Sequence, residues 1–112
     1  MMAFLMGLKS ISPAEVNGQV QAKQVNVFDV NSAQSWQKAH VPGAKNLDSA
    51  TFVVADLPSD RNSSLVFYCS NPMCRKAPIA AKRAKQMGYE NVKVMSAGIT
   101  GWVGSNLPTE TG

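Results

Sequence analysis

The sequence is poor in the residues that build disulfide frameworks and metal sites. Its 112 residues include two cysteines, Cys69 and Cys74, and one histidine, His40. Cysteines so close together cannot join distant segments, which excludes a structural disulfide framework. With His40 they supply at most three ligands, at a spacing unlike that of zinc pairs. We therefore expect no metal site and no other cofactor.

Long apolar runs and repeats are also missing. The apolar segment Met1–Leu8 has no positive region before it and is too short for a membrane span or a full signal peptide. Hydrophobic residues make up 45% of the chain and charged residues 16%, an ordinary globular composition. We expect one domain over 1–112, with a core at about 10–108 and an N-terminal extension, 1–9, of undefined role.

Acidic residues are absent between Arg61 and Tyr89. The basic residues of the same segment therefore give it a positive potential, which suits a small anionic ligand. A nucleic acid is not expected as a partner, because no aromatic residues alternate with these charges and no nucleic-acid motif is present. Cysteines confined to one stretch fit a reducing cytoplasm; an exported protein whose signal was removed is the alternative. The six basic residues of the segment are Arg61, Arg75, Lys76, Lys82, Arg83 and Lys85.

The most informative stretch is a strand, a loop and a helix around Cys69. Leu65–Tyr68 is rich in β-formers, Cys69–Arg75 is polar, and Ala77–Met87 has helical periodicity, with Ile79 on the face expected to pack inward. The loop amides and the start of the helix point at one place, to which the helix dipole adds positive potential. The same field favours a thiolate, so Cys69 is a candidate nucleophile.

The basic residues that follow the loop support an anion site. Arg75 and Lys76 stand at the positive end of the helix dipole, which costs roughly 0.3–1 kcal/mol each. A bound anion would offset that cost. The alternative is that Cys69 is a buried core cysteine and Arg75 a solvated surface charge.

Strands and helices alternate along the rest of the chain. Ser12, Pro13 and Glu15 have the pattern of a capped helix start. Such alternation predicts an α/β domain with a mainly parallel sheet, in which ligands bind at the carboxyl ends of strands. The other expected elements are a strand at 25–30, a short helix from Asn31 or Ser32 to Ala39, a brief strand near 45–47, a strand at 91–95 and a glycine-rich turn at 96–102.

Five motifs occur in an order that resembles the rhodanese family over roughly 12–102. The resemblance implies a rhodanese-like fold, with a central, mainly parallel five-stranded sheet flanked by helices on both faces. It also implies a sulfurtransferase, in which a cysteine takes the outer sulfur of a donor as a persulfide. The motifs are Asp29-Val30, His40-Val41-Pro42-Gly43-Ala44, Tyr68-Cys69, Gly88-Tyr89-Glu90-Asn91-Val92 and Gly98-Ile99-Thr100-Gly101-Trp102.

Carried over by motif, the family's roles fall on the loop. Cys69 becomes the persulfide carrier and Arg75 neutralises the donor's charge. The implied partners are a small anionic sulfur donor such as thiosulfate and an acceptor that is a thiol, cyanide or a protein. His40 and Asp29 are accessory residues with a structural role, and Lys76 is a further accessory residue. The substrate-binding loop consists of Ser70, Asn71, Pro72, Met73, Cys74 and Arg75.

The chain departs from the family pattern in three ways. Asn31 stands where an arginine is common and Ser35 where a glutamate is frequent, so a usual charged interaction is missing. Five residues separate Cys69 from Arg75, one more than in the usual sulfurtransferase loop. Cys74 is an additional loop cysteine, either a resolving thiol for Cys69 or a small apolar residue that packs under the loop.

These departures keep two other functions open. Cysteine, five residues and arginine is the spacing of rhodanese-related phosphatases and arsenate reductases, although the loop offers no acid to protonate a leaving group. The other is a non-catalytic module that binds an anion or a protein and is switched by oxidation of Cys69 and Cys74.

Overall fold

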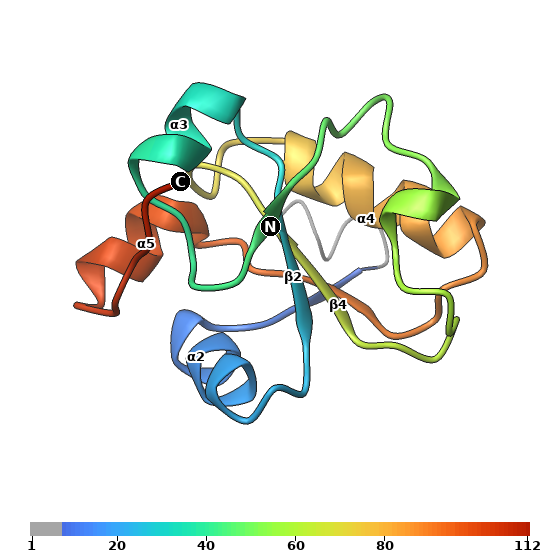
Figure 1. The fold of residues 1–112 in the computed structure, drawn as a ribbon, viewed down its shortest axis with the longest axis horizontal. Coiled ribbons are helices and arrows are strands. Elements are labelled where there is room, and N and C mark those ends of the chain that lie inside the picture. The colour runs from blue at the N-terminus through green and yellow to red at the C-terminus, as the bar shows by residue number, and fades with distance from the viewer. Residues whose placement is uncertain (1–7) are drawn as a thin grey trace.

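The computed structural model describes residues 8–112, whose strands form one five-stranded sheet (Figure 1). The strand order is β1-β5-β4-β2-β3 and every neighbouring pair is parallel. The predicted parallel α/β sheet is therefore confirmed. Met1–Gly7 lie outside the described residues, while Leu8 is buried in the core. The strands are β1 (Lys9–Ser10), β2 (Asn26–Asp29), β3 (Lys45–Asn46), β4 (Leu65–Tyr68) and β5 (Val92–Val94).

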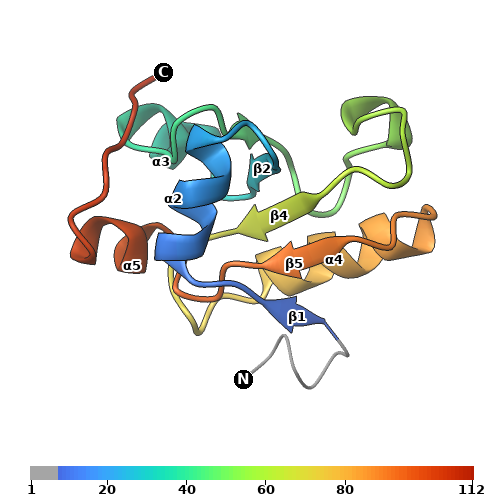
Figure 2. The ribbon, with the colours of Figure 1, turned by 90° about the horizontal axis from the view of Figure 1, so that it is seen from below.

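Helices cover both faces of this sheet, as expected (Figure 2). The central strand β4 is buried on both sides: Leu65 and Phe67 pack toward α4, whereas Val66 and Tyr68 pack toward α2 and α5. This alternation follows from the period of two in a strand. The helices are α2 (Pro13–Gln21), α3 (Ala33–Lys38), α4 (Lys76–Gln86) and α5 (Gly98–Gly104), with a 3₁₀ turn, η1 (Val54–Asp56), on the α4 side.

The helix ends lie close to where the sequence predicts them. Ser12 caps α2, since its Oγ accepts a hydrogen bond of 3.2 Å from the Glu15 N–H, and Pro13 occupies the first helical position. Ser32 caps α3 in the same way. Gly88 follows α4 with φ +103°, the left-handed conformation typical of a residue that ends a helix.

Two local predictions are wrong. Ile79 does not pack inward and is 44% exposed, because the buried face of α4 is formed by Ala77, Pro78, Ala80, Ala81 and Ala84. The segment predicted as a glycine-rich turn at 96–102 instead leads into the helix α5.

Burial of one aromatic side chain explains α5. Trp102 is fully buried and its Nε1 donates a 2.7 Å hydrogen bond to the Pro108 carbonyl. Packing of this indole overrides the low helix propensity of the neighbouring glycines. Trp36 is likewise a packing residue, with its Nε1 bonded to the Ala44 carbonyl at 2.9 Å.

Candidate active site

Cys69 lies at the carboxyl end of β4, the central strand, and is 3% exposed. The first turn of α5 holds the backbone here. The Ile99 N–H donates to the Cys69 carbonyl at 2.9 Å, and the Thr100 N–H donates to the Ser70 carbonyl at 3.0 Å. Ile99 and Thr100 belong to a motif that the sequence marks, but their role as anchors of the loop was not predicted.

Gly98 allows this close approach of α5 to the loop. It has φ +66°, and a Cβ there would lie 2.6 Å from the carbonyl carbon and oxygen of Ser70. Only glycine fits such a contact without displacement of one backbone. The position of the reactive loop therefore depends on a residue that lies 29 positions beyond Cys69 in the sequence.

The loop turns back on itself at Asn71. Its Oδ1 accepts a 2.9 Å hydrogen bond from the Met73 N–H, and its carbonyl accepts a 3.1 Å bond from the Cys74 N–H. These two amides are thus occupied within the loop and do not point at an anion. The Met73 side chain is 85% exposed. The turn returns the chain toward Cys69 and places Cys74 beside it.

A cavity of about 230 Å³ opens beside the two cysteines. Most of its wall is apolar, and the end of β5 and the residues after it line it together with the loop and the start of α4. Of the sequence-predicted site residues, it brings together Cys69, Asn71, Pro72 and Cys74. No aspartate or glutamate is among its lining residues. The remaining lining residues, which the sequence did not indicate, are Ala77, Pro78, Val94, Met95, Ser96 and Ala97.

The low pKa expected for Cys69 is not found. Burial, together with a hydrogen bond with the Cys74 thiol, raises the pKa of the Cys69 thiol to about 12, against hydrogen bonds from the Ala77 and Ser70 amides. Burial also disfavours a Cys74 thiolate. Hydrogen bonds from the Cys69 thiol and from the Lys76 and Ser70 amides outweigh it and lower the pKa of Cys74. The two thiols titrate as a pair whose negative charge resides mainly on Cys74.

Positive charge at the loop comes from Arg75 and Lys76, which begin α4 and are exposed. Two of the other basic residues, Arg61 and Arg83, make their contacts away from Cys69. Arg61 stacks on Tyr89 and donates from Nε to the Met87 carbonyl at 3.0 Å. Arg83, half-buried, stacks on Phe52 near η1. The positive potential at Cys69 is therefore more local than the sequence indicates.

Asp29 and His40 are buried and lie outside the lining of the cavity. Asp29 accepts hydrogen bonds from the Tyr68 hydroxyl at 2.7 Å and the Asn31 N–H at 2.8 Å, and Tyr68 in turn accepts from the Val41 N–H at 3.0 Å. His40 Nδ1 lies 2.7 Å from the carbonyl oxygen of Trp36, on whose ring it stacks. These contacts join the ends of β2 and β4 to neighbouring loops.

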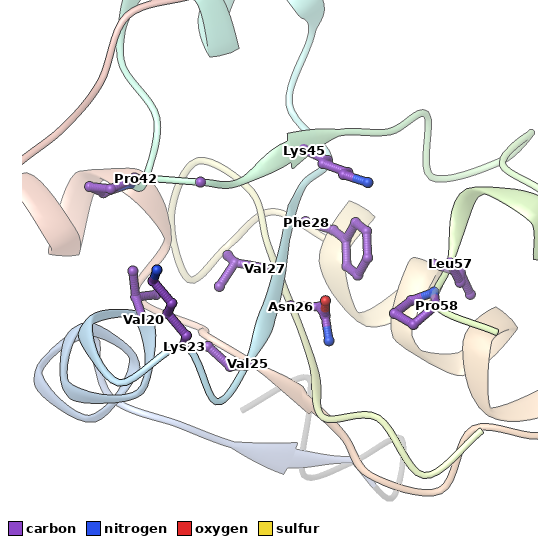
Figure 3. Close-up of a pocket in the computed structure, with 11 residues that line it drawn as sticks. Val20, Lys23, Val25, Asn26, Val27, Phe28, Pro42, Lys45, Leu57 and Pro58 are labelled. Atoms are coloured by element: carbon purple, nitrogen blue, oxygen red, sulfur yellow. The ribbon is translucent and has the colours of Figure 1, made fainter. Parts of the chain in front are cut away.

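Larger hollows lie away from the cysteines, and two of them adjoin β2. One, of about 510 Å³, follows the outer edge of β2 before β3 pairs with it (Figure 3). Lys23 and Lys45 flank it, and its lining contains no cysteine, histidine or carboxylate. The other, of about 570 Å³, lies at the carboxyl ends of β2 and β3, and Lys76 lines it. Neither is lined by a cysteine, so thiol chemistry is expected at the smaller cavity.

Comparison with known proteins decides the family. Residues 12–105 match the family described as "Rhodanese-like domain". The chain belongs to this family. Among solved structures, the rhodanese-like domain superposes on the BH2092 protein from Bacillus halodurans with a TM-score of 0.84 and 23% identity, over 92% of this chain and 77% of that one.

Relatives of known name carry the fold in different settings. The "Thiosulfate sulfurtransferase GlpE" of Pseudoalteromonas translucida is 26% identical over 97 residues, which cover 87% of this chain and 90% of that protein. The "HTH-type transcriptional regulator Rv0324" of Mycobacterium tuberculosis is 33% identical over 105 residues, 92% of this chain. The rhodanese-like domain spans only 45% of that regulator's length.

Residues 8–112 contain neither a helix that could span a membrane nor a cluster of side chains that could hold a metal ion. No helix there has the length and apolar character to cross a membrane. No three histidine, cysteine, aspartate or glutamate side chains in that range are placed to hold a metal ion.

Proposed function

We propose that the protein is a sulfurtransferase that moves a sulfane sulfur from thiosulfate, or a similar anionic donor, to a thiol or cyanide through a persulfide on Cys69. The observation that carries this proposal is the position of Cys69, a buried residue in the lining of a small cavity, with hydrogen bonds from the Ser70 and Ala77 amides to its sulfur. Similarity to the GlpE sulfurtransferases supports the same reaction.

The donor step follows from the thiol pair. Cys69 gives its proton to the Cys74 thiolate, to which it is hydrogen-bonded. The Cys69 thiolate then attacks the outer sulfur of thiosulfate, the S–S bond of the donor breaks, and sulfite leaves with the electron pair of that bond. The proton held by Cys74 passes to the outer sulfur, so Cys69 retains that sulfur as a protonated persulfide, Cys74 returns to its thiolate, and sulfite leaves as the dianion.

In the acceptor step Cys69 is the leaving group instead of the nucleophile. A thiolate or cyanide attacks the outer sulfur of the persulfide, and the Cys69 thiolate leaves. Arg75 and Lys76 raise the local concentration of the anionic donor and offset its charge. Both side chains are exposed, so their contribution depends on ionic strength.

A phosphatase function receives less support, even though the spacing from Cys69 to Arg75 suits one. A cradle for a tetrahedral oxyanion needs free amides along the whole loop, and those of Met73 and Cys74 donate to Asn71. The cavity lining also has no carboxylic acid to protonate a leaving group.

Turnover of thiosulfate with cyanide, followed as thiocyanate, tests the proposal. We expect turnover by the wild type and a loss of at least about a hundredfold in Cys69→Ser. An aryl phosphate and arsenate serve as parallel substrates. Turnover of either one that depends on Cys69, with none of thiosulfate, would overturn the proposal in favour of phosphatase or reductase. Absence of any turnover would favour a binding module.

A further inference from the structure

We propose that Cys74 is a second sulfur carrier, which receives the sulfane sulfur from Cys69 and presents it to thiol acceptors too large to reach Cys69. This relay rests on the proposed sulfurtransferase function. It assigns to Cys74 a chemical step, in place of a packing role.

The turn at Asn71 provides the geometry for this relay. The 3.1 Å hydrogen bond from the Cys74 N–H to the Asn71 carbonyl folds the loop so that both cysteines line the same cavity of about 230 Å³. Cys74 also packs against the hydrophobic cluster that contains Cys69. A sulfur added to Cys69 enters this cavity, where Cys74 is the second nucleophile.

Hydrogen-bond donors of the loop surround the Cys74 sulfur. The amides of Ser70 and Lys76 and the Ser70 hydroxyl all donate to it, and donors of this kind hold bound anions in loops. Arg75 and Lys76 follow directly in the chain. Cys74 is therefore the more readily ionised thiol of the pair, a property that a residue buried only for packing would not need.

The two cysteines differ in how accessible they are to an acceptor. Cys69 is 3% exposed, so only a small acceptor can approach a persulfide on it. Cys74 is half-buried and sits between the exposed side chains of Met73 and Arg75. Movement of the sulfur from Cys69 to Cys74 brings it from the floor of the cavity to the surface of the loop.

The step is a thiol–persulfide exchange and needs no oxidant. The Cys74 thiolate attacks the outer sulfur of the Cys69 persulfide, a new S–S bond forms at Cys74, and the Cys69 thiolate leaves. The proton stays on the transferred sulfur and the negative charge moves from Cys74 to Cys69. Attack on the inner sulfur would instead give a Cys69–Cys74 disulfide and release hydrosulfide.

The test locates the added sulfur. The reduced full chain is treated with thiosulfate, alkylated rapidly, and fragmented as the intact protein in a mass spectrometer, for the wild type, Cys69→Ser and Cys74→Ser. We expect one added sulfur in the wild type, on Cys69 in some molecules and on Cys74 in others. In Cys74→Ser we expect it on Cys69, and in Cys69→Ser on neither residue.

The other results separate failure of the relay from failure of the proposed function. Sulfur on Cys69 alone in the wild type overturns the relay and leaves the sulfurtransferase intact. Loss of two hydrogens with release of sulfide overturns it in favour of a disulfide, and direct loading of Cys74 in Cys69→Ser makes Cys74 an independent acceptor. No added sulfur in any variant refutes both proposals.

Acceptor size supplies a kinetic control within one variant. In Cys74→Ser we expect the rate with glutathione to fall about tenfold, because no sulfur reaches the exposed surface of the loop, where glutathione can attack it. The rate with cyanide, a small anion that enters the cavity, should fall by a smaller factor, which reports the loss of Cys74 from the donor step alone. An equal effect on both acceptors contradicts the relay.

Discussion

The contact between α5 and the loop makes Gly98→Ala an informative perturbation. Gly98 has φ +66°, and a Cβ on it would lie 2.6 Å from the Ser70 carbonyl carbon and oxygen. The left-handed conformation costs an alanine about 1–2 kcal/mol. Relief of the clash must separate the two backbones and weaken the hydrogen bonds from the Ile99 and Thr100 amides, each worth about 1 kcal/mol. The combined loss is about 3 kcal/mol of unfolding free energy.

Urea unfolding measures this loss. With a denaturant slope of about 1–3 kcal/mol per molar for a small protein, the midpoint should fall by about 1–3 M urea. The folded fraction of Gly98→Ala should also take up sulfur from thiosulfate more slowly, because Ser70 is displaced together with the amide that faces Cys69.

Gly104→Ala is the matched control in the same helix. Its Cβ would meet nothing within 4 Å and its φ is not positive. We expect no loss and a gain of at most about 1 kcal/mol, because alanine at a compatible position lowers the conformational entropy of the unfolded chain. Equal midpoints for Gly98→Ala and Gly104→Ala would refute the close-contact argument.

Three other predictions concern titration and buried polar groups. In Cys74→Ser the pKa of Cys69 should fall below about 12, because the thiol and charge that raise it are gone, and the pH profile of Cys69 alkylation should shift to lower pH; an unchanged profile contradicts the pairing. Tyr68→Phe should lose about 1–3 kcal/mol, because it leaves the Val41 N–H and the Asp29 carboxylate short of a partner; urea unfolding with no loss refutes this. Burial raises the pKa of Asp29 above 3.8, against the effect of the Tyr68 hydrogen bond. The stability that Asp29 contributes is therefore complete below pH 3.8 and is lost as the pH rises through the pKa of the folded state. Relative to Asp29→Asn, the unfolding free energy of the wild type should fall with rising pH, and a parallel pH dependence of the two proteins contradicts the assignment.

The fold could be predicted from the sequence because its signals are local and agree with one another. The apolar run Leu65–Tyr68, the Ser12 cap and the Gly88 helix end each have a short-range cause, and the structure has them where they were expected. Ile79 and the helix α5 were not predictable in this way. Ile79 is displaced from the core by an alanine stripe, and α5 forms because Trp102 is buried by distant parts of the chain.

The candidate site was only partly predictable for the same reason. The motif around Cys69 indicates a nucleophile, but the burial that raises its pKa depends on tertiary packing. The sequence also does not indicate that Asn71 occupies the amides of Met73 and Cys74. The part of the cavity wall at 94–97 comes from β5 and the segment after it, and it lies near the loop because β5 is the neighbour of β4 in the sheet.

The central claim is that Cys69 carries a sulfane sulfur, and intact-protein mass spectrometry tests it most directly. The reduced wild type and Cys69→Ser are measured before and after treatment with thiosulfate. The account predicts that the wild type gains the mass of one sulfur atom and that Cys69→Ser gains none. A wild-type mass that thiosulfate leaves unchanged would contradict it.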